Sequence, residues 1–533
     1  MDYSEFSVGN AADFLQSVTI IDDQFLWGTK STDSVATALS PPEKDEFKGS
    51  LEKLAVTSSL ALDGAIDLKS IVRGFSENGV VCCPYEWTEH DDEPPMSAHK
   101  SDVVIFDWKL VGDQLQDGSL VSGFIKKILD QDSIDTPRLR FVSIYSSEKP
   151  TEIFDTLCKE LQENYKIERH NDFLDIELSD AAHAVRLQYI SKSDVSENEL
   201  ANALIERFSS FVEGFLPNIV LSAVTEIRER SFEYLARFHK GLDMAILSHY
   251  SALRSQKDAF PTAEGQFRDY VSNLIGNSVL DSLTYSQRVK EASSYDKIEG
   301  YLKSKNPVVM GLDTDTVLED KRKILDILGT ENHEGFISLS ISELDIRSGK
   351  KKKFQGGKVP LVFDPVGSND RLELTQLDLQ KNLYKGSDSS PILRLGSIVE
   401  LDDTFYVCTQ PLCEGVRLAK DIPHKFSFIR LKEVVGDNTF FFVVCHNGSY
   451  RKFKNETRQQ HLKTFSFKSD NDTKDVRAKW SDSQHAFVTA GDDKLNWLGE
   501  LKDIYSQELL HRLASAASRV GSDKYEWMRL QQP

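Results

Sequence analysis

Four short apolar runs near the start of the chain each end at a side chain that can take part in chemistry. The runs and their end residues are Val18–Ile21 with Asp22 and Asp23, Val103–Phe106 with Asp107, Phe141–Tyr145 with Ser146, and Leu187–Ser191 with Lys192. An acid at a strand end is ordinary turn chemistry, so each residue taken singly has a structural explanation. An acid pair, a single acid, a hydroxyl and a lysine in this order instead suit phosphoryl transfer to a carboxylate.

Phosphoryl transfer gives each of these side chains a role. The protein has to position the reacting groups and neutralise charge on the transferred oxygens. Mg²⁺ prefers oxygen ligands, which Asp22 and Asp23 can supply beside Asp107. Asp107 is the single acid at its strand end and is the predicted nucleophile, while Lys192 and Ser146 would bond phosphoryl oxygens. The sequence therefore predicts a metal-dependent phosphoryl-acceptor site.

The elements that must position this site alternate along residues 13–195, a pattern typical of a parallel sheet with crossover helices. In such a sheet the carboxyl ends of the strands meet at one edge, where ligands bind. The expected helices are Ile66–Ser76, Gly118–Leu129 and Thr151–Tyr165, and a further strand is expected at Gly79–Tyr85. Residues 27–63 and the hairpin-like Lys166–Arg186 exceed normal connections, and we interpret both as insertions.

The order of these elements resembles the receiver domain of response regulators over about residues 15–195. The stretch from Asp107 through Leu110 to Gly112 is similar to the family's Asp-x-x-Leu-Pro-Gly loop, and Asp117-Gly118 before a helix is similar to the family's next segment. Tyr189 lies three residues before Lys192, where the family carries its switch aromatic. Two residues depart from the pattern, because Val111 and Ser193 stand where the family has prolines.

The resemblance implies a flavodoxin-like α/β fold with a parallel five-stranded sheet and a site that accepts a phosphoryl group from a histidine kinase. It implies that the backbone carbonyl of Lys109 joins Asp23 and Asp107 on Mg²⁺, with Asp22 acting through water. It also implies that Ser146 and Tyr189 move together as a switch. Lys109 and Glu148 would flank the attacking water and set the lifetime of the acyl phosphate. No other enzymatic activity is expected.

The rest of the chain is expected to form three further parts. Residues 196–330 show helical spacing at Leu200–Phe215, Ile219–Phe238 and Gln266–Leu283, which predicts an all-helical connector. Residues 331–480 predict a β-rich domain, and residues 481–533 a terminal amphipathic helix over 494–520 and a tail. The strands expected in the β-rich domain are Phe336–Leu344, Val359–Phe363, Ser397–Leu401, Phe405–Thr409, Phe426–Leu431 and Thr439–Cys445.

Composition narrows the class of protein. A chain of 533 residues is longer than one hydrophobic core usually supports, so several domains are expected. The formal net charge of −20 disfavours a surface that coats nucleic acid. Six scattered cysteines do not make a disulfide framework, and no apolar stretch is long enough to cross a membrane. We expect a reduced, cytoplasmic protein whose partners are a histidine kinase and a second receiver or effector protein, with a homodimer as a further form.

Three weaker motifs have plainer explanations. His239-Lys240-Gly241 loosely resembles a histidine phosphotransfer motif, but an exposed histidine at a helix end is the simpler interpretation. Cys408 and Cys413 lack a second ligand pair for zinc, so buried strand cysteines are favoured. Lys350–Lys353 could contact nucleic acid, but a solvated basic hairpin is the simpler explanation.

The function predicted from these features is a response-regulator-like signalling protein. Its architecture more loosely resembles receiver proteins of two-component-like bacterial anti-phage defence systems, which would make the chain a phosphoryl buffer or regulator. Two alternatives stay open: an interaction scaffold in which the receiver fold is not phosphorylated, and a nucleic-acid-binding output protein that uses the β-rich domain.

Overall fold

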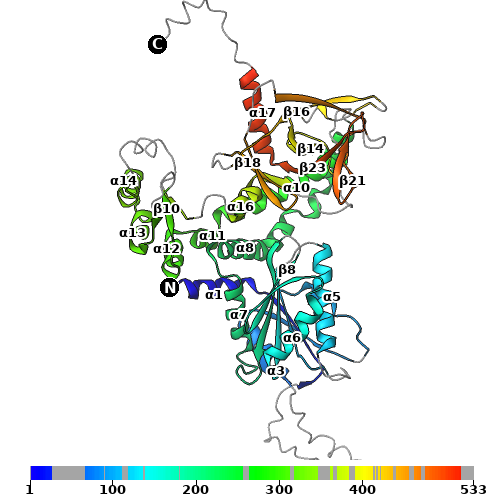
Figure 1. Cartoon of the computed structure of the whole chain (residues 1–533). Coiled ribbons are helices and arrows are strands. Elements are labelled where there is room, and N and C mark those ends of the chain that lie inside the picture. The colour runs from blue at the N-terminus through cyan, green and yellow to red at the C-terminus, as the bar shows by residue number, and fades with distance from the viewer. Residues whose placement is uncertain are drawn as a thin grey trace, which may run out of the picture. The chain divides into compact units, whose positions relative to one another are not determined.

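A computed structural model describes residues 2–517 except for a set of internal segments. These segments are 27–65, 89, 111–117, 136–138, 179–180, 256–262, 312–316, 346–360, 364–368, 383–389, 412–413, 416–417, 420–421, 436–439, 455–460 and 470–474. The chain divides into two compact units (Figure 1). The first unit comprises Met1–Ser231 with Asp281–Lys305, and the second comprises Phe232–Leu280 with Asn306–Pro533.

A seven-stranded sheet forms the centre of the first unit. Its strands lie in the order β4-β1-β5-β6-β9-β8-β7. Their bounds are β1 Ser17–Asp22, β4 Val81–Glu86, β5 Val103–Phe106, β6 Arg140–Ser146, β7 Lys166–Arg169, β8 Phe173–Leu178 and β9 Ala181–Ser191. The pairs β4–β1, β1–β5, β5–β6 and β6–β9 are all parallel, which confirms the predicted five-stranded parallel core. This strand order is that of flavodoxin-like folds.

Helices cover both faces of this sheet and build its two cores (Figure 1). On one face, α5 and α6 pack apolar side chains against Val104, Phe106 and Ile144. On the other, α1, α3 and α7 pack against Val18 and Ile105. The helix bounds are α1 Tyr3–Phe14, α3 Leu68–Glu77, α4 Met96–Lys100, α5 Ser119–Asp135, α6 Pro150–Leu161 and α7 Leu200–Phe211. Since the strands are covered on both faces, their continuous apolar runs follow from the layering.

The second predicted insertion is an antiparallel hairpin, as its alternating sequence indicates. The strands β7 and β8 pair with each other, and β8 pairs with β9, which would otherwise be the edge of the parallel sheet. An unpaired strand edge invites pairing with other chains, and the hairpin moves this edge from the long strand β9 to the short strand β7. Short strands β2 Phe25–Leu26 and β3 Ile66–Asp67 flank the first predicted insertion, residues 27–63, all of which lies outside the described residues.

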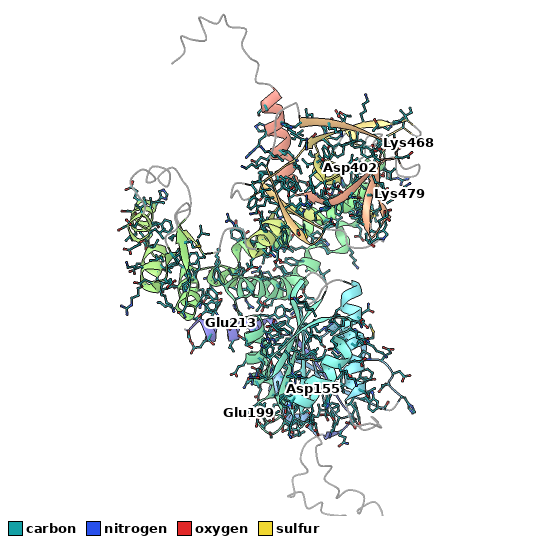
Figure 2. The ribbon with its side chains drawn as sticks, in the orientation of Figure 1. Asp155, Glu199, Glu213, Asp402, Lys468 and Lys479 are labelled. Atoms are coloured by element: carbon teal, nitrogen blue, oxygen red, sulfur yellow. The ribbon has the colours of Figure 1, made fainter. Side chains whose placement is uncertain are left out.

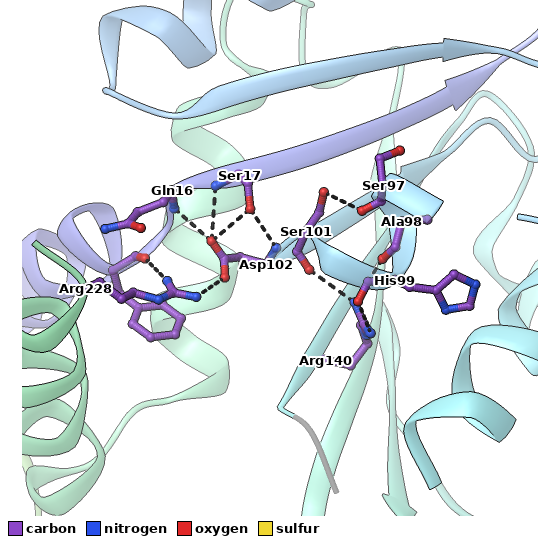
Figure 3. A network of polar contacts seen from close by, with 10 residues as sticks. Gln16, Ser17, Ser97, Ala98, His99, Ser101, Asp102, Arg140 and Arg228 are labelled. Carbon is purple, nitrogen blue, oxygen red and sulfur yellow. Dashed lines mark hydrogen bonds and ion pairs between the residues drawn. The ribbon is translucent and has the colours of Figure 1, made fainter. Parts of the chain in front are cut away.

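A polar network lies at the amino-terminal ends of the parallel strands, opposite their carboxyl ends (Figure 3). The Asp102 carboxylate accepts hydrogen bonds from the backbone of Gln16 and Ser17 and from Arg228 on helix α8, Phe215–Arg237. The Nη2 of Arg228 lies 2.5 Å from this carboxylate. Nearby, the fully buried guanidinium of Arg140 donates to the Asp132 carboxylate and to backbone carbonyls of α4 and Ser101. These contacts fix the amino-terminal ends of the strands, far along each strand from the predicted site.

Helices dominate residues 200–304, as predicted. Their bounds are α7 Leu200–Phe211, α8 Phe215–Arg237, the 3₁₀ turn η1 Lys240–Leu242, α9 Asp243–Ser255, α10 Ala263–Tyr285, α11 Gln287–Ala292 and α12 Tyr295–Ser304. The last two helices return to the first unit, where the ring of Tyr301 packs edge-on against Tyr3 of α1 at 5.2 Å. The predicted helical connector therefore contributes to both units.

One predicted strand, Phe336–Leu344, is wrong. These residues lie in helix α14, His333–Glu343, which packs with α13, Lys321–Leu328, beside the small sheet of β10 Val309–Gly311, β11 Val317–Leu318 and β12 Leu361–Val362. The alternation of Ile and Ser favours a strand, but Ile337, Ile341 and Leu344 also share one helical face and all three are buried. Asn332 caps the helix by accepting from the Gly335 amide, and the cap together with packing of this face on α13 favours the helix.

An antiparallel sheet forms the largest part of the second unit. Its order is β20-β16-β15-β14-β23-β22-β21, with β13 also on β23. The bounds are β13 Gln380–Asn382, β14 Ser397–Leu401, β15 Thr404–Cys408, β16 His424–Arg430, β20 Leu462–Phe467, β21 Lys479–Ser481, β22 Gln484–Val488 and β23 Lys494–Leu501. A smaller sheet holds β17 Lys432–Glu433, β18 Phe442–His446 and β19 Ser449–Lys454, and α16 Asn369–Leu379 lies nearby. The β-rich character of this region is confirmed.

The start of the terminal helix differs from the prediction. Residues 494–501 form strand β23, and the helix α17 covers only Asp503–Ala517. Leu495, Trp497 and Leu501 are buried at period two, which is the pattern of a strand that is half covered. Leucines spaced three apart favoured a helix there, and strand pairing with β14 overrides that preference. The expected stop at Gly521 lies outside the described residues.

Candidate functional site

Three carboxylates converge at the carboxyl edge of the parallel sheet. Asp22 is the last residue of β1, Asp23 follows it, and Asp107 follows β5, the strand paired directly with β1. One carboxylate oxygen of each lies within 4.8 Å of the others, and among the described residues this is the only cluster of its kind. Adjacent parallel strands that end in acids at the same level explain the convergence.

The deepest of the three acids is Asp22, which is 1% exposed. Its Oδ1 accepts a hydrogen bond from the Gln24 amide at 2.7 Å, whereas its Oδ2 is buried and accepts none within the described part of the chain. Burial, and then the neighbouring charge of Asp107, raise the pKa of Asp22 to about 7. A buried carboxylate oxygen without a hydrogen bond, facing two other acids, fits a bound hard cation.

Lys192 supplies the positive charge of the site. It follows β9, and its Nζ lies 3.1 Å from Oδ1 of Asp107 and 3.9 Å from Oδ2 of Asp22. Burial raises the pKa of Asp107 and the ammonium opposes that shift. Three carboxylates and one ammonium leave the cluster short of positive charge, which is the electrostatic condition that a divalent cation relieves.

Ser146 and Tyr189 are joined through the backbone of the loop after β6. Ser146 is the last residue of β6 and is buried, and its carbonyl accepts from the Lys192 amide at 3.0 Å. The Tyr189 hydroxyl donates to the carbonyl of Glu148 at 2.7 Å and lies 3.3 Å from that of Ser146. A displacement of the loop after Ser146 would therefore change the hydrogen bonds of the Tyr189 hydroxyl.

Lys109 and Glu148 form an ion pair between the loops that follow β5 and β6. The Lys109 Nζ lies 2.6 Å from Oε1 of Glu148, and both side chains are about half-exposed. These are the residues two positions beyond Asp107 and Ser146. The pair therefore links the loop that follows the predicted acceptor, Asp107, to the loop that follows the predicted hydroxyl residue, Ser146.

A contact that sequence reasoning missed joins Trp108, the residue after Asp107, to Gly118. Trp108 is buried, and a Cβ placed on Gly118 would come within 2.1 Å of its ring. Gly118 also has a φ of +76°, a conformation that glycine adopts readily. The residues 111–117 between them, with Gly112 and Asp117, lie outside the described residues. No spacing in the sequence indicates that a residue beside the acceptor packs on this glycine.

An open pocket of ≈ 520 Å³ adjoins the end of β9. Tyr189 and Ser191 line it together with Glu206 and Arg207 of α7, and Arg207 pairs with Asp172 of the hairpin turn at 3.1 Å. Asp155 and Glu199, both labelled in Figure 2, are exposed acidic side chains elsewhere on the first unit. Tyr189 therefore lines this pocket while its hydroxyl contacts the loop after β6.

The weaker motifs do not form sites among the described residues. His239 is exposed and accepts a hydrogen bond from the Gly241 amide at 3.1 Å, as a turn residue does. Cys408 is buried in β15, as favoured, whereas Cys413 and Lys350–Lys353 lie outside the described residues. None of the described helices is long and apolar enough to cross a membrane.

The strand order together with an acid cluster and a lysine at its carboxyl edge defines a domain of the receiver type. Comparison with protein families agrees, because the family described as the response receiver domain matches residues 14–197. The chain therefore carries a response receiver domain, and the resemblance expected from the sequence is confirmed. No curated protein and no solved structure matches the chain.

Proposed function

We propose that Asp107 accepts a phosphoryl group from a phosphohistidine of a histidine kinase, and that the chain is a signalling protein or phosphoryl buffer. The observation that carries this proposal is the placement of Lys192 against Asp107, with Asp22 and Asp23 beside them. A shared, largely enclosed ammonium is more than structural acids at strand ends require, whereas an acceptor carboxylate needs it because the incoming oxygens carry negative charge.

The metal that this chemistry requires is Mg²⁺, and the residues present fit it. The donors are carboxylate oxygens of Asp23 and Asp107 with, as the family resemblance implies, the carbonyl of Lys109, while Asp22 takes part through water. The Oδ2 of Asp22, buried without a hydrogen bond, is the observation that supports a cation here. When bound, the ion neutralises charge on the phosphoryl oxygens.

The transfer itself exchanges one bond for another. An Asp107 carboxylate oxygen attacks phosphorus, a P–O bond forms, and the P–N bond to the donor histidine breaks. The leaving imidazole nitrogen keeps the bond's electron pair. Lys192 already contacts Asp107, so it is placed to pair with a phosphoryl oxygen as the carboxylate charge is used. Hydrolysis later returns the carboxylate and releases inorganic phosphate.

The signal would leave the site through the loop after β6. A phosphoryl group on Asp107 attracts the hydroxyl of Ser146, and the loop's carbonyls hold the hydroxyl of Tyr189. Tyr189 lines the pocket beside α7, so its displacement alters a surface that a partner protein can contact. The pocket wall is therefore the proposed output surface of the receiver domain.

The experiment is phosphorylation of the full chain by acetyl phosphate, followed on a phosphate-affinity gel with and without Mg²⁺. We expect a retarded band that requires Mg²⁺ and disappears in Asp107→Asn. Asp194→Asn is the matched control, since Asp194 follows Lys192 at the same sheet edge outside the acid cluster, and it should keep the band. No retarded band in the folded wild type would leave the interaction scaffold as the function.

A further inference from the structure

A helical segment of the second unit exposes an unusual number of large apolar side chains. We call residues 232–280, which hold the end of α8, η1, α9 and most of α10, the helical arm. Its large apolar side chains that are 39–79% exposed are Phe232, Leu235, Phe238, Leu242, Met244, Leu247, Tyr270, Ile275 and Leu280. Contiguous exposed apolar surface marks interaction sites more often than isolated exposed residues do.

The helical arm has almost no core of its own. Among its described residues the buried apolar ones are Tyr234, Leu253 and Ala263, and none of these described residues belongs to a hydrophobic cluster. Helices in water depend on packing of an apolar face for most of their stability. The arm therefore has apolar faces that need a partner.

Polar and aromatic contacts give the arm a defined shape where α9 meets α10. The Tyr250 hydroxyl and the Arg254 guanidinium both bond the Glu264 carboxylate, at 2.8 Å and 2.7 Å. The ring of Tyr250 also packs edge-on against Phe267 at 5.3 Å. These contacts use the inner sides of the two helices and leave Met244, Leu247 and Ile275 uncovered.

The charge of the arm restricts what can cover it. Residues 232–280 contain five acids and five bases, which cancel, whereas the whole chain carries −20. A strongly basic partner would be attracted to the rest of the chain and not to the arm. Two copies of the acidic chain repel each other elsewhere, but their neutral arms can meet without that penalty.

The summed exposed apolar area of the arm is comparable to one side of a standard interface. At roughly 100 Å² for each partly exposed large side chain, the nine together present on the order of 900 Å², and a standard interface takes about 800 Å² from each partner. An isologous contact uses the same residues on both copies, so exposed side chains of one arm pack against those of the other.

We propose that two copies of this chain associate through their helical arms, with Leu235 and Leu247 among the buried contacts. The association does not depend on phosphorylation, and Asp107→Asn is expected to dimerise as the wild type does. The arm would place two receiver domains in one particle.

The test is the mass of the full chain in solution by sedimentation velocity over a range of protein concentration. We expect a dimer at micromolar concentration, and a monomer for Leu235→Glu/Leu247→Glu, with association weakened about a hundredfold or more. Both residues are exposed in a single copy, so circular dichroism should show an unchanged fold. Leu377→Glu is the matched control, because Leu377 is 72% exposed on α16 outside the arm, and it should remain dimeric.

Hydrogen exchange of the arm amides at two protein concentrations gives a second readout. We expect protection in residues 232–280 that increases with concentration. A wild-type chain that is monomeric throughout, or a dimer that survives Leu235→Glu/Leu247→Glu, would overturn the proposal. Protection that does not change with concentration would also overturn it, since another segment of the same chain would then cover the arm.

Discussion

The Lys192 ammonium lies 3.1 Å from Oδ1 of Asp107 and also within 3.9 Å of Asp22. One cation thus contacts acids from the ends of two different strands, although it comes from a third. The contact balances part of the negative charge of the cluster and faces the oxygen that would carry the phosphoryl group. We therefore expect charge balance at this edge of the sheet to govern both metal binding and transfer.

Lys192→Met should separate metal binding from phosphoryl transfer. The substitution removes a positive charge that competes with a divalent cation, so Mg²⁺ binding should be retained or strengthened. Transfer should slow by about 10²-fold, the usual loss when one charge-stabilising donor is removed. Calorimetric titration of Mg²⁺ and the rate of labelling by acetyl phosphate measure the two effects. An unchanged labelling rate would show that Lys192 has no part in the transfer.

Mg²⁺ binding should depend on pH because the pKa of Asp22 is raised to about 7. Below that pH the ion has to displace a proton, so its apparent affinity should fall by about tenfold for each pH unit. Asp22→Asn should bind Mg²⁺ more weakly and lose this dependence. Titrations between pH 5.5 and 8, on the order of one pKa unit to either side, provide the measurement, and an affinity independent of pH in the wild type would contradict it.

The same group affects stability in the absence of Mg²⁺. A raised pKa means that the folded state holds the proton of Asp22 more tightly than the unfolded state does. The resulting stabilisation is fully present below about pH 4 and is lost as pH rises to about 7. Saturating Mg²⁺ should restore stability at neutral pH, and thermal melts with and without the ion should diverge as pH increases. Melts that diverge in acid instead would refute this assignment.

The ion pair between Lys109 and Glu148 should tune the lifetime of the acyl phosphate. Glu148→Gln breaks the pair, and since exposed pairs contribute up to about 1 kcal/mol, the half-life should change by up to about fivefold. The reversed pair, Lys109→Glu with Glu148→Lys, should return the half-life toward the wild-type value if the contact itself matters. A double-mutant cycle on the decay rate measures this coupling, and additive effects would exclude it.

Gly118→Ala should destabilise the receiver domain through Trp108. The new methyl group would lie 2.1 Å from the indole ring, so we expect the free energy of unfolding to fall by about 3 kcal/mol. Gly79→Ala is the control, because Gly79 has a similar φ of +74° but open space around it, and should lose only about 1 kcal/mol. Equal losses in calorimetry would show that backbone strain alone accounts for the effect.

The parallel sheet and the acid cluster could be predicted because they depend on local signals. Each strand of the site is a continuous apolar run with a polar end, and parallel strands bring those ends to one edge. Asp22, Asp107 and Lys192 meet for this reason. The places of these residues at the ends of the apolar runs are enough to predict the site without any knowledge of side-chain packing.

Other features depend on which of two competing local patterns is stabilised by packing or strand pairing, or on contacts between residues far apart in the chain. The alternation in 336–344 suits a strand, yet the cap at Asn332 and packing on α13 make it a helix. Residues 494–501 have helical spacing, yet pairing with β14 makes them a strand. The contact of Trp108 with Gly118 and the return of α11 and α12 to the first unit join residues far apart in the chain.

Chemical trapping of the acyl phosphate tests the central claim most directly. Hydroxylamine converts an aspartyl phosphate to a hydroxamate, which mass spectrometry of peptides can locate. After treatment with acetyl phosphate and Mg²⁺, we predict the hydroxamate at Asp107 and at neither Asp22 nor Asp23. A hydroxamate at another residue, or none in a folded chain that binds Mg²⁺, would contradict the assignment of Asp107 as the phosphoryl acceptor.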